Sequence, residues 1–197
     1  MVMSVDTAKG LHLVCNRFRS KAVSSSTQSE KHQKFEALID TVAADLYRFA
    51  IWRCRDKLVA EELIQETYIR VWKSIHTLRD VNSAKSWVFT IFRREYARQF
   101  ERKKLTIVDL DSLEWDSIRA VSDNQVDTIA LRKAFRSLDE KYTEPLLLQV
   151  LGGFGCREIS EVLGISETSV MTRLFRARKQ LRQYLSDDVE TTNKEAP

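Results

Sequence analysis

Basic side chains with a helical spacing are concentrated near the end of this 197-residue chain, in GISETSVMTRLFRARKQLRQ, residues 164–183. Apolar residues recur there at steps of three and four, which is the period of an amphipathic helix. Guanidinium and ammonium groups bind phosphates, and a guanidinium also pairs with the acceptor edge of guanine. The stretch therefore predicts a helix that binds nucleic acid through the basic residues between its apolar ones, namely Arg173, Arg176, Arg178, Lys179 and Arg182.

The residues around this stretch have the spacing of a helix-turn-helix. Such a motif needs a small residue where the second helix crosses the first, a glycine at the turn, and a β-branched residue inside the second helix. Ser160, Gly164 and Val170 supply these three residues in order. We expect helices over 156–163 and from 167 to about 184. The alternative is an ordinary helical hairpin with a solvated basic face.

The second of these helices is expected to have an inner and an outer face. With Val170 and Leu174 directed inward, the outer residues would meet base edges and phosphates in the major groove of DNA. Arg176 is placed to pair with a guanine through two hydrogen bonds, whereas the neighbouring arginines are expected to contact phosphate. The outer residues are Met171, Thr172, Phe175, Arg176 and Lys179.

A second group of cations lies in AKSWVFTIFRREYARQFERKK, residues 84–104, which also has a helical pattern. Arg94, Arg98 and Arg102 repeat at four-residue steps and form one stripe. Rings beside cations suit unpaired bases, which stack on the rings while their phosphates pair with arginine. The alternative is that the rings form the core, as we expect for Trp87. The aromatic residues are Trp87, Phe89, Phe92, Tyr96 and Phe100.

The helix expected at 59–76 presents a different surface. Its apolar residues face inward, and its polar face is formed by Glu61, Glu62, Gln65, Glu66 and Ile69. An acidic face with one exposed apolar residue either serves solubility or docks a basic partner helix. The helical period does not distinguish these two interpretations.

The composition favours an all-α fold of two small domains. Only 5 Gly and 2 Pro occur with 43% hydrophobic residues, which suits helices better than a turn-rich sandwich or barrel. Between two basic blocks, residues 105–130 carry six acidic side chains and one basic side chain. This distribution fits a two-domain binder of a polyanion, and the alternative is a solvated surface with a linker. We expect a flexible extension at 1–34, a helical domain at 35–104 that starts with a helix over 35–55, an acidic linker at 105–126, a helix-turn-helix domain at 127–185 and an acidic tail at 186–197.

Within the second domain, the helical pattern is expected to start near Val126. It breaks at SLDEKYTEP, residues 137–145, and resumes through Leu151. Gly152 and Gly153 follow, as glycine commonly does at the end of a helix.

The sequence argues against a secreted, membrane-spanning, metal-binding or catalytic protein. The three cysteines are far apart with no CxxC pair, so neither a disulfide framework nor a four-ligand zinc site is predicted. No apolar run approaches the ~18 residues of a membrane span. No Ser/His/Asp set or glycine-rich phosphate loop is present. We therefore expect a cytoplasmic protein that is not an enzyme, with no cofactor, no metal, no small-molecule substrate and no membrane insertion.

Three segments resemble the sigma-70 family of bacterial RNA polymerase sigma factors, in its extracytoplasmic-function (ECF) group. AEELIQETYIRVWKSIHTLR, residues 60–79, is similar to the helix that grips RNA polymerase in that family. SAKSWVFTIFRREYARQFERKK, residues 83–104, is similar to the segment that follows it. GCREISEVLGISETSVMTRLFRARKQL, residues 155–181, resembles the carboxy-terminal helix-turn-helix. The segments occur in the order of the family, which makes the match more specific than any one motif.

The resemblance implies a promoter-specificity subunit that binds core RNA polymerase, helps to melt one promoter element and recognises a farther one. The polymerase contacts would be Glu61, Glu62, Gln65, Glu66 and Ile69. The melted strand would meet the loop RDVNSAKS and the cations after it, through Asn82, Ser83, Lys85, Arg93, Arg94, Arg98 and Arg102. The distal element would be bound by Ser166, Thr168, Ser169, Met171, Thr172, Arg173, Phe175, Arg176 and Lys179. The family also implies an anti-sigma factor as a partner and a linker that occupies a nucleic-acid channel.

Two other functions remain open at this point. A one-component transcription regulator would use residues 35–104 as an effector or dimer domain and would bind promoters without polymerase. A DNA recombinase with a carboxy-terminal helix-turn-helix would need an α/β catalytic domain, and the sequence has no buried strand runs for one.

Overall fold

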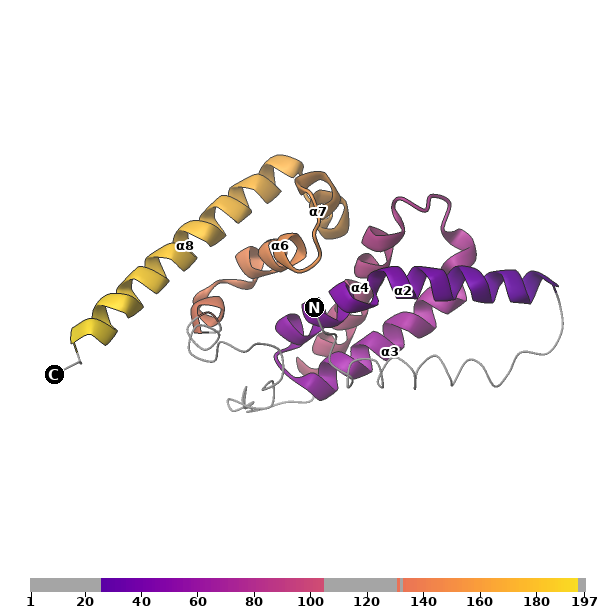
Figure 1. Ribbon diagram of the computed structural model, residues 1–197, viewed down its shortest axis with the longest axis horizontal. Coiled ribbons are helices and arrows are strands. Elements are labelled where there is room, and N and C mark those ends of the chain that lie inside the picture. The colour runs from indigo at the N-terminus through magenta and orange to yellow at the C-terminus, as the bar shows by residue number, and fades with distance from the viewer. Residues whose placement is uncertain (1–25, 105–130, 132, 195–197) are drawn as a thin grey trace.

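The computed structural model describes the backbone of residues 26–104, 131 and 133–194, and the side chains of 28–99, 131 and 133–186. In these ranges the elements are helices and no strand is present, so the predicted all-α fold is confirmed (Figure 1). The predicted linker at 105–126 and the side chain of Arg102 lie outside the described residues. No described helix is both long enough and apolar enough to cross a membrane.

The first lobe is a three-helix unit. It consists of α2 (Ser26–Cys54), α3 (Lys57–Ser74), the short 3-10 helix η1 (Ile75–Thr77) and α4 (Ala84–Lys104). The apolar stripes of α2, α3 and α4 meet in a core. At its centre Phe49 is fully buried, with its ring centroid 5.3 Å from that of Phe89 and 5.7 Å from that of Phe92.

The start of α2 differs from the sequence prediction, which placed it at residue 35. The helix begins at Ser26, and the His32 ring lies edge-on to Trp72 of α3, 5.8 Å from it between ring centroids. The Phe35 ring packs edge-on to Trp72 at 5.2 Å, and the Lys31 ammonium lies 4.6 Å from the Trp72 ring centroid. These contacts extend the helix beyond its apolar stripe, because the half-buried Trp72 ring offers a surface on which a polar segment can pack.

The second lobe is built on α6 (Glu140–Val150), α7 (Cys156–Leu163) and α8 (Glu167–Lys194). Helix α7 has the predicted bounds, whereas α8 continues past the expected end near residue 184. Apolar side chains from all three helices are buried together, namely Leu147, Leu148, Ile159, Val162, Val170 and Leu174.

The predicted break at residues 137–145 is wrong for most of that range. Helix α6 starts at Glu140 and contains Pro145. The first turn is formed by hydrogen bonds from the backbone N–H groups of Tyr142 and Thr143 to the carbonyl of Asp139. Proline removes one backbone donor from a helix, but here Pro145 is buried beside Leu146 and Leu147. The free energy gained by burying these apolar side chains therefore outweighs the loss of the hydrogen bond that Pro145 cannot donate.

The turn between α7 and α8 has the predicted chemistry. Gly164 ends α7 in the left-handed conformation, with φ of 67°, and its N–H donates to the Ser160 carbonyl. The Ser169 backbone N–H donates to the Ser166 side-chain oxygen at 3.2 Å, which caps the start of α8. The helix-turn-helix geometry is thus set by local residues.

We expect Gly164→Ala to lower the free energy of unfolding by about 1 kcal/mol. A β-carbon at this position would meet no atom within 4 Å, so the loss would come from the positive φ alone. Asparagine tolerates the left-handed region better than alanine does. Urea denaturation of Gly164→Ala and Gly164→Asn tests this, and equal losses for the two variants would contradict the explanation.

The two lobes pack against each other, which the sequence did not predict. The ring centroids of Phe89 in α4 and Phe154, which precedes α7, are 4.8 Å apart. The ring centroids of Trp52 in α2 and Phe135 in the second lobe are 5.1 Å apart. Buried apolar side chains of both lobes therefore form one continuous core.

Candidate nucleic-acid and polymerase interfaces

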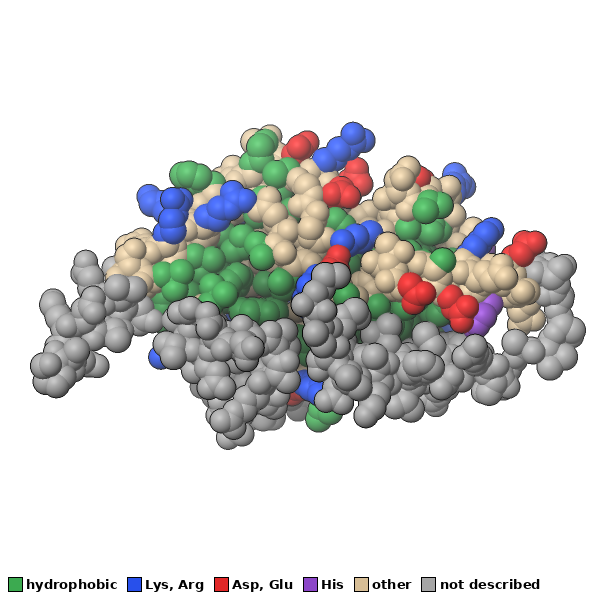
Figure 2. Space-filling view, in the orientation of Figure 1, with side chains coloured by type: hydrophobic (Ala, Val, Ile, Leu, Met, Phe, Trp, Pro, Cys, Tyr) green, Lys and Arg blue, Asp and Glu red, His purple; other side chains and the backbone are tan. Residues whose placement is uncertain are grey.

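Helix α8 has the inner and outer faces expected for a recognition helix. Val170, Leu174 and Ala177 are buried against the rest of the second lobe. On the opposite face Met171 is 51% exposed and Phe175 is 64% exposed. Thr172, Arg176 and Lys179 are exposed on the same helix. Figure 2 shows basic side chains along α8 with exposed hydrophobic side chains beside them.

The first turn of α8 is held by hydroxyl groups. The side-chain oxygens of Ser166 and Ser169 are 2.7 Å apart, and the Thr172 hydroxyl donates to the Thr168 carbonyl at 2.9 Å. Ser166 and Ser169 are thus engaged in shaping the turn, whereas Thr168 is exposed beside them. Of these three predicted DNA-binding residues, Ser166 and Thr168 are exposed and Ser169 is half-buried.

The arginines of α8 differ in their surroundings. Arg176 is exposed, and its Nη1 donates to the Tyr142 hydroxyl at 3.4 Å. This hydrogen bond lowers the pKa of the Tyr142 phenol. Arg178 donates to the side-chain oxygen of Gln149 in α6, and Arg173 is half-buried. Arg176 is therefore positioned over α6 with its guanidinium still open to solvent.

The polar face predicted on α3 is presented to solvent. Glu62, Gln65 and Glu66 are exposed, whereas Glu61 and Ile69 are half-buried. The Gln99 side-chain amide donates to the Glu62 carboxylate at 3.0 Å, and the Lys57 ammonium lies 3.9 Å from the Glu61 carboxylate. The opposite face buries Ala60, Leu63, Ile64, Thr67, Tyr68 and Val71.

The loop between η1 and α4 is a small structured turn. The Asp80 side chain accepts a hydrogen bond from the Asn82 backbone N–H at 2.9 Å, and the Ser83 hydroxyl donates to the Asp80 carbonyl at 3.0 Å. Val81 is 84% exposed at the tip, and Asn82 is exposed beside it. The prediction named the loop but omitted Asp80 and Val81 from its binding residues. An aspartate two residues before an asparagine is a signal for such a turn.

The predicted cations of α4 are mostly paired within the protein. The Lys85 ammonium lies 2.5 Å from the Asp45 carboxylate, and Arg98 pairs with Glu95. Burial disfavours ionisation of Asp45, but the hydrogen bonds from Lys85 and Arg48 outweigh it and hold the pKa of this carboxyl below its usual value. Among the described side chains of the stripe, Arg94 is the exposed one.

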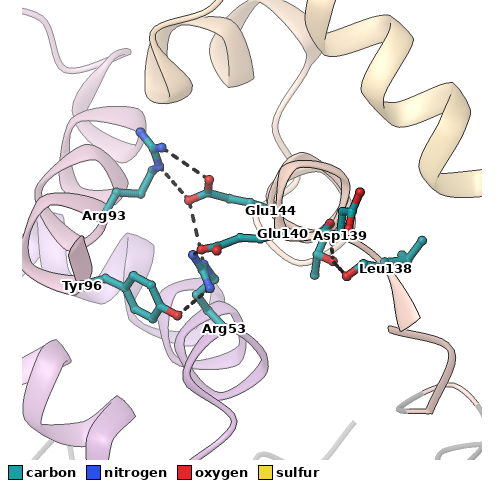
Figure 3. Close-up of polar contacts among 8 residues, drawn as sticks. Arg53, Arg93, Tyr96, Leu138, Asp139, Glu140 and Glu144 are labelled. Carbon is teal, nitrogen blue, oxygen red and sulfur yellow. Dashed lines mark hydrogen bonds and ion pairs between the residues drawn. The ribbon is translucent and has the colours of Figure 1, made fainter. Parts of the chain in front are cut away.

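Arg93 is bound by the second lobe. Its Nε donates to the Glu144 carboxylate at 2.7 Å, its Nη2 to the other Glu144 oxygen at 3.4 Å, and its Nη1 to the Val162 carbonyl at 2.7 Å (Figure 3). Nearby, Arg53 of α2 donates to the Tyr96 hydroxyl at 2.6 Å and pairs with Glu140. Burial raises the pKa of Tyr96 to about 12, so this phenol stays protonated at neutral pH.

The aromatic residues of α4 belong to the core rather than to a stacking surface. Phe89 and Phe92 are fully buried. Trp87 and Tyr96 are half-buried and pack against the core. The side chain of Phe100 lies outside the described residues. The core interpretation of these rings is thus confirmed for the described ones.

Family models and known proteins match both lobes. The model described as Sigma-70 region 2 matches residues 38–106, and the model described as Sigma-70, region 4 matches residues 128–181. The ECF RNA polymerase sigma factor SigX of Bacillus subtilis (strain 168) is 33% identical over 165 residues, which are 78% of this chain and 84% of SigX. SigM of the same organism is 33% identical over 144 residues, 70% of this chain and 86% of SigM.

Two solved structures share the fold. The sigma factor RpoE of Bartonella quintana, in complex with the anti-sigma factor NepR, matches with a TM-score of 0.69 and 24% identity, covering 77% of this chain and 96% of that one. CnrH, in complex with the cytosolic domain of CnrY, matches with a TM-score of 0.60 and 17% identity, covering 89% of this chain and 97% of that one. With both family regions in order, the chain belongs to the sigma-70 family, in its ECF group, as a sigma factor that binds core RNA polymerase and directs transcription initiation at specific promoters.

Proposed function

We propose that the two lobes divide promoter recognition, the second lobe binding the distal promoter element through the outer face of α8. The observation that carries this proposal is the burial of Val170, Leu174 and Ala177, which turns the opposite face of the helix outward. That face combines guanidinium, hydroxyl and apolar groups, which hydrogen-bond to base edges and contact the thymine methyl group in a major groove. The binding residues are Ser166, Thr168, Ser169, Met171, Thr172, Arg173, Phe175, Arg176 and Lys179.

Reconstitution with core RNA polymerase tests this division. The chain is mixed with core enzyme and a promoter library, and run-off transcripts are sequenced. We expect transcripts from promoters that share two separated elements. Tight sequence-specific binding to DNA that is unaffected by core enzyme would instead favour a one-component regulator. The family membership does not favour that alternative.

The first lobe is proposed to dock on polymerase through the outer face of α3. Glu62, Gln65 and Glu66 stand outward on this face, with Glu61 and Ile69 at its margins. Acidic groups at the rim of an interface attract a basic partner surface and raise the rate of association. The alternative is that this acidic face only keeps the protein soluble. A measurement of binding to core enzyme distinguishes docking from solubility.

Glu66→Lys is expected to weaken association with core polymerase several-fold, because it reverses one charge on the docking face. Glu161→Lys is the matched control, since it makes the same charge change at an exposed position on α7. Competition of each variant with labelled wild-type chain for core enzyme measures the effect. Equal competition by both variants would remove Glu66 from the docking face.

Promoter melting is proposed for the loop at 79–83 and the cations of α4. Taking a base out of the stack costs a few kcal/mol, and stacking on a side chain returns ~1–3 kcal/mol per base. A small loop can therefore capture an opened strand only with help from polymerase contacts. The residues proposed to hold that strand are Asn82, Ser83, Lys85, Arg93, Arg94, Arg98 and Arg102.

We also propose that the chain works in the cytoplasm with polymerase and is controlled by an anti-sigma factor. Two of the structures that share its fold were solved with an anti-sigma factor and with the cytosolic domain of another protein. Sigma factors act by binding DNA and polymerase, and no step proposed for this chain needs a catalytic side chain. Co-purification from cells that express a tagged chain tests for such a partner.

A further inference from the structure

We propose that Tyr142 of α6 is a positioning residue for promoter recognition, because its hydroxyl group fixes the direction of the Arg176 guanidinium on α8. The fixed direction sharpens the preference for one base pair of the distal element. This inference rests on the base contact proposed for Arg176. It extends recognition from α8 to a second helix, since Tyr142 lies in the first turn of α6.

The Tyr142 side chain is held firmly in the second lobe. The residue is 8% exposed and belongs to the buried core. Its backbone N–H donates to the Asp139 carbonyl at 2.9 Å. The Lys141 ammonium lies 4.9 Å from the Tyr142 ring centroid and 3.0 Å from the Asp139 carboxylate. Side chains in a close-packed core keep one rotamer on average, so the Tyr142 hydroxyl has a fixed position relative to α8.

The hydroxyl of Tyr142 binds one nitrogen of Arg176 and leaves the other edge of the guanidinium open. Nη1 donates to the hydroxyl at 3.4 Å. In the part of the chain that the structure describes, Nε and Nη2 of Arg176 have no hydrogen-bond partner. These two nitrogens carry parallel N–H groups, which can pair with the O6 and N7 acceptors of one guanine. Contact with Tyr142 is therefore compatible with base recognition.

The restriction of Arg176 has a consequence for discrimination between bases. A long exposed side chain has many rotamers, and ordering them on binding costs free energy. Tyr142 restricts these rotamers before DNA arrives, which lowers that cost for the correct base. A guanidinium that moved freely would also pair with a neighbouring base or a phosphate. The hydroxyl of Tyr142 therefore favours guanine at one position over the other bases there.

The test measures promoter preference with polymerase reconstituted from core enzyme and each full-length variant, on a library randomised at the distal element. Tyr142→Phe removes the hydroxyl and keeps the buried ring. We expect it to reduce discrimination about threefold to tenfold at the base pair that Arg176→Ala affects, and at no other. Tyr184→Phe is the matched control, because it makes the same change at a half-buried ring farther along α8. It should leave the preference at every position unchanged.

A double variant separates this inference from the base contact on which it rests. In an Arg176→Ala background, Tyr142→Phe should cause no further loss of preference. If Tyr142→Phe keeps the wild-type preference while Arg176→Ala relaxes one position, Tyr142 does not position the guanidinium and the role of Arg176 stands. If Arg176→Ala relaxes no position, the base contact fails and the positioning role fails with it.

Urea denaturation of the same variants distinguishes positioning from a structural role of the hydroxyl. A positioning residue changes the preference at one base pair while the midpoint of unfolding stays that of the wild type. A structural residue lowers the midpoint and weakens all promoters about equally. The second result for Tyr142→Phe would overturn the proposal.

Discussion

Phe89→Ala is expected to lower the free energy of unfolding by about 3–5 kcal/mol. The Phe89 ring is fully buried and lies 5.3 Å from Phe49 and 4.8 Å from Phe154, measured between ring centroids. Its removal leaves a cavity in the first lobe and also removes a contact between the lobes. Urea denaturation followed by circular dichroism gives the midpoint and the slope of the transition.

Phe175→Ala is the matched control for this prediction. It makes the same chemical change at a ring that is 64% exposed on α8, so its effect on stability should stay within about 0.5 kcal/mol. A comparable loss in both variants would mean that the Phe175 ring is buried in solution. No loss in Phe89→Ala would contradict the shared core of the two lobes.

The parts of the fold that the sequence predicted are those set by neighbours along the chain. Helix α7 has its predicted bounds because Gly164 ends it in a left-handed conformation. The N-cap at Ser166 and the inward position of Val170 and Leu174 also follow from short spacings. In each case a side chain acts within one or two turns of its own position, and helical periodicity describes that range well.

The packing of the lobes depends on contacts between residues far apart in the chain. Arg93 and Glu144 form their ion pair across 51 positions, and Phe154 reaches Phe89 in another element. Neither pairing has a spacing that periodicity can detect. A four-residue repeat identified the stripe of α4, in which Arg94 is exposed and Arg98 pairs with Glu95 one turn away. The partners of Lys85 and Arg93 instead depend on tertiary structure, so these two predicted strand contacts are paired within the protein.

The error at Pro145 has a related cause. A proline counts against a helix in any local rule, because its ring removes a donor and restricts the residue before it. Burial of Leu146, Leu147 and Leu148 in the second lobe is a tertiary gain that such a rule does not include. The sequence therefore predicted the helix after Pro145 but not the turn before it.

Arg176→Ala is expected to relax the preference of the reconstituted polymerase at one base pair of the distal element, by about 1–3 kcal/mol. That loss corresponds to roughly a tenfold to hundredfold decrease in discrimination. Arg176 is exposed on α8, and its Nη1 donates to the Tyr142 hydroxyl of α6 at 3.4 Å, which restricts the directions open to its long side chain. A guanidinium with a fixed direction suits two-pronged pairing with the acceptor atoms of guanine. Transcription from a library randomised at the distal element gives the preference at every position.

Lys179→Ala distinguishes base recognition from attraction to phosphate. Lys179 is exposed one turn along the same helix, and loss of a phosphate contact should weaken all promoters about equally and reduce the dependence on salt. The two variants should therefore differ in kind: Arg176→Ala alters the ranking of promoters, whereas Lys179→Ala preserves the ranking and lowers every affinity. An unchanged ranking in Arg176→Ala would place that side chain among the phosphate contacts, and the recognition of bases would then fall to Met171, Thr172 and Phe175.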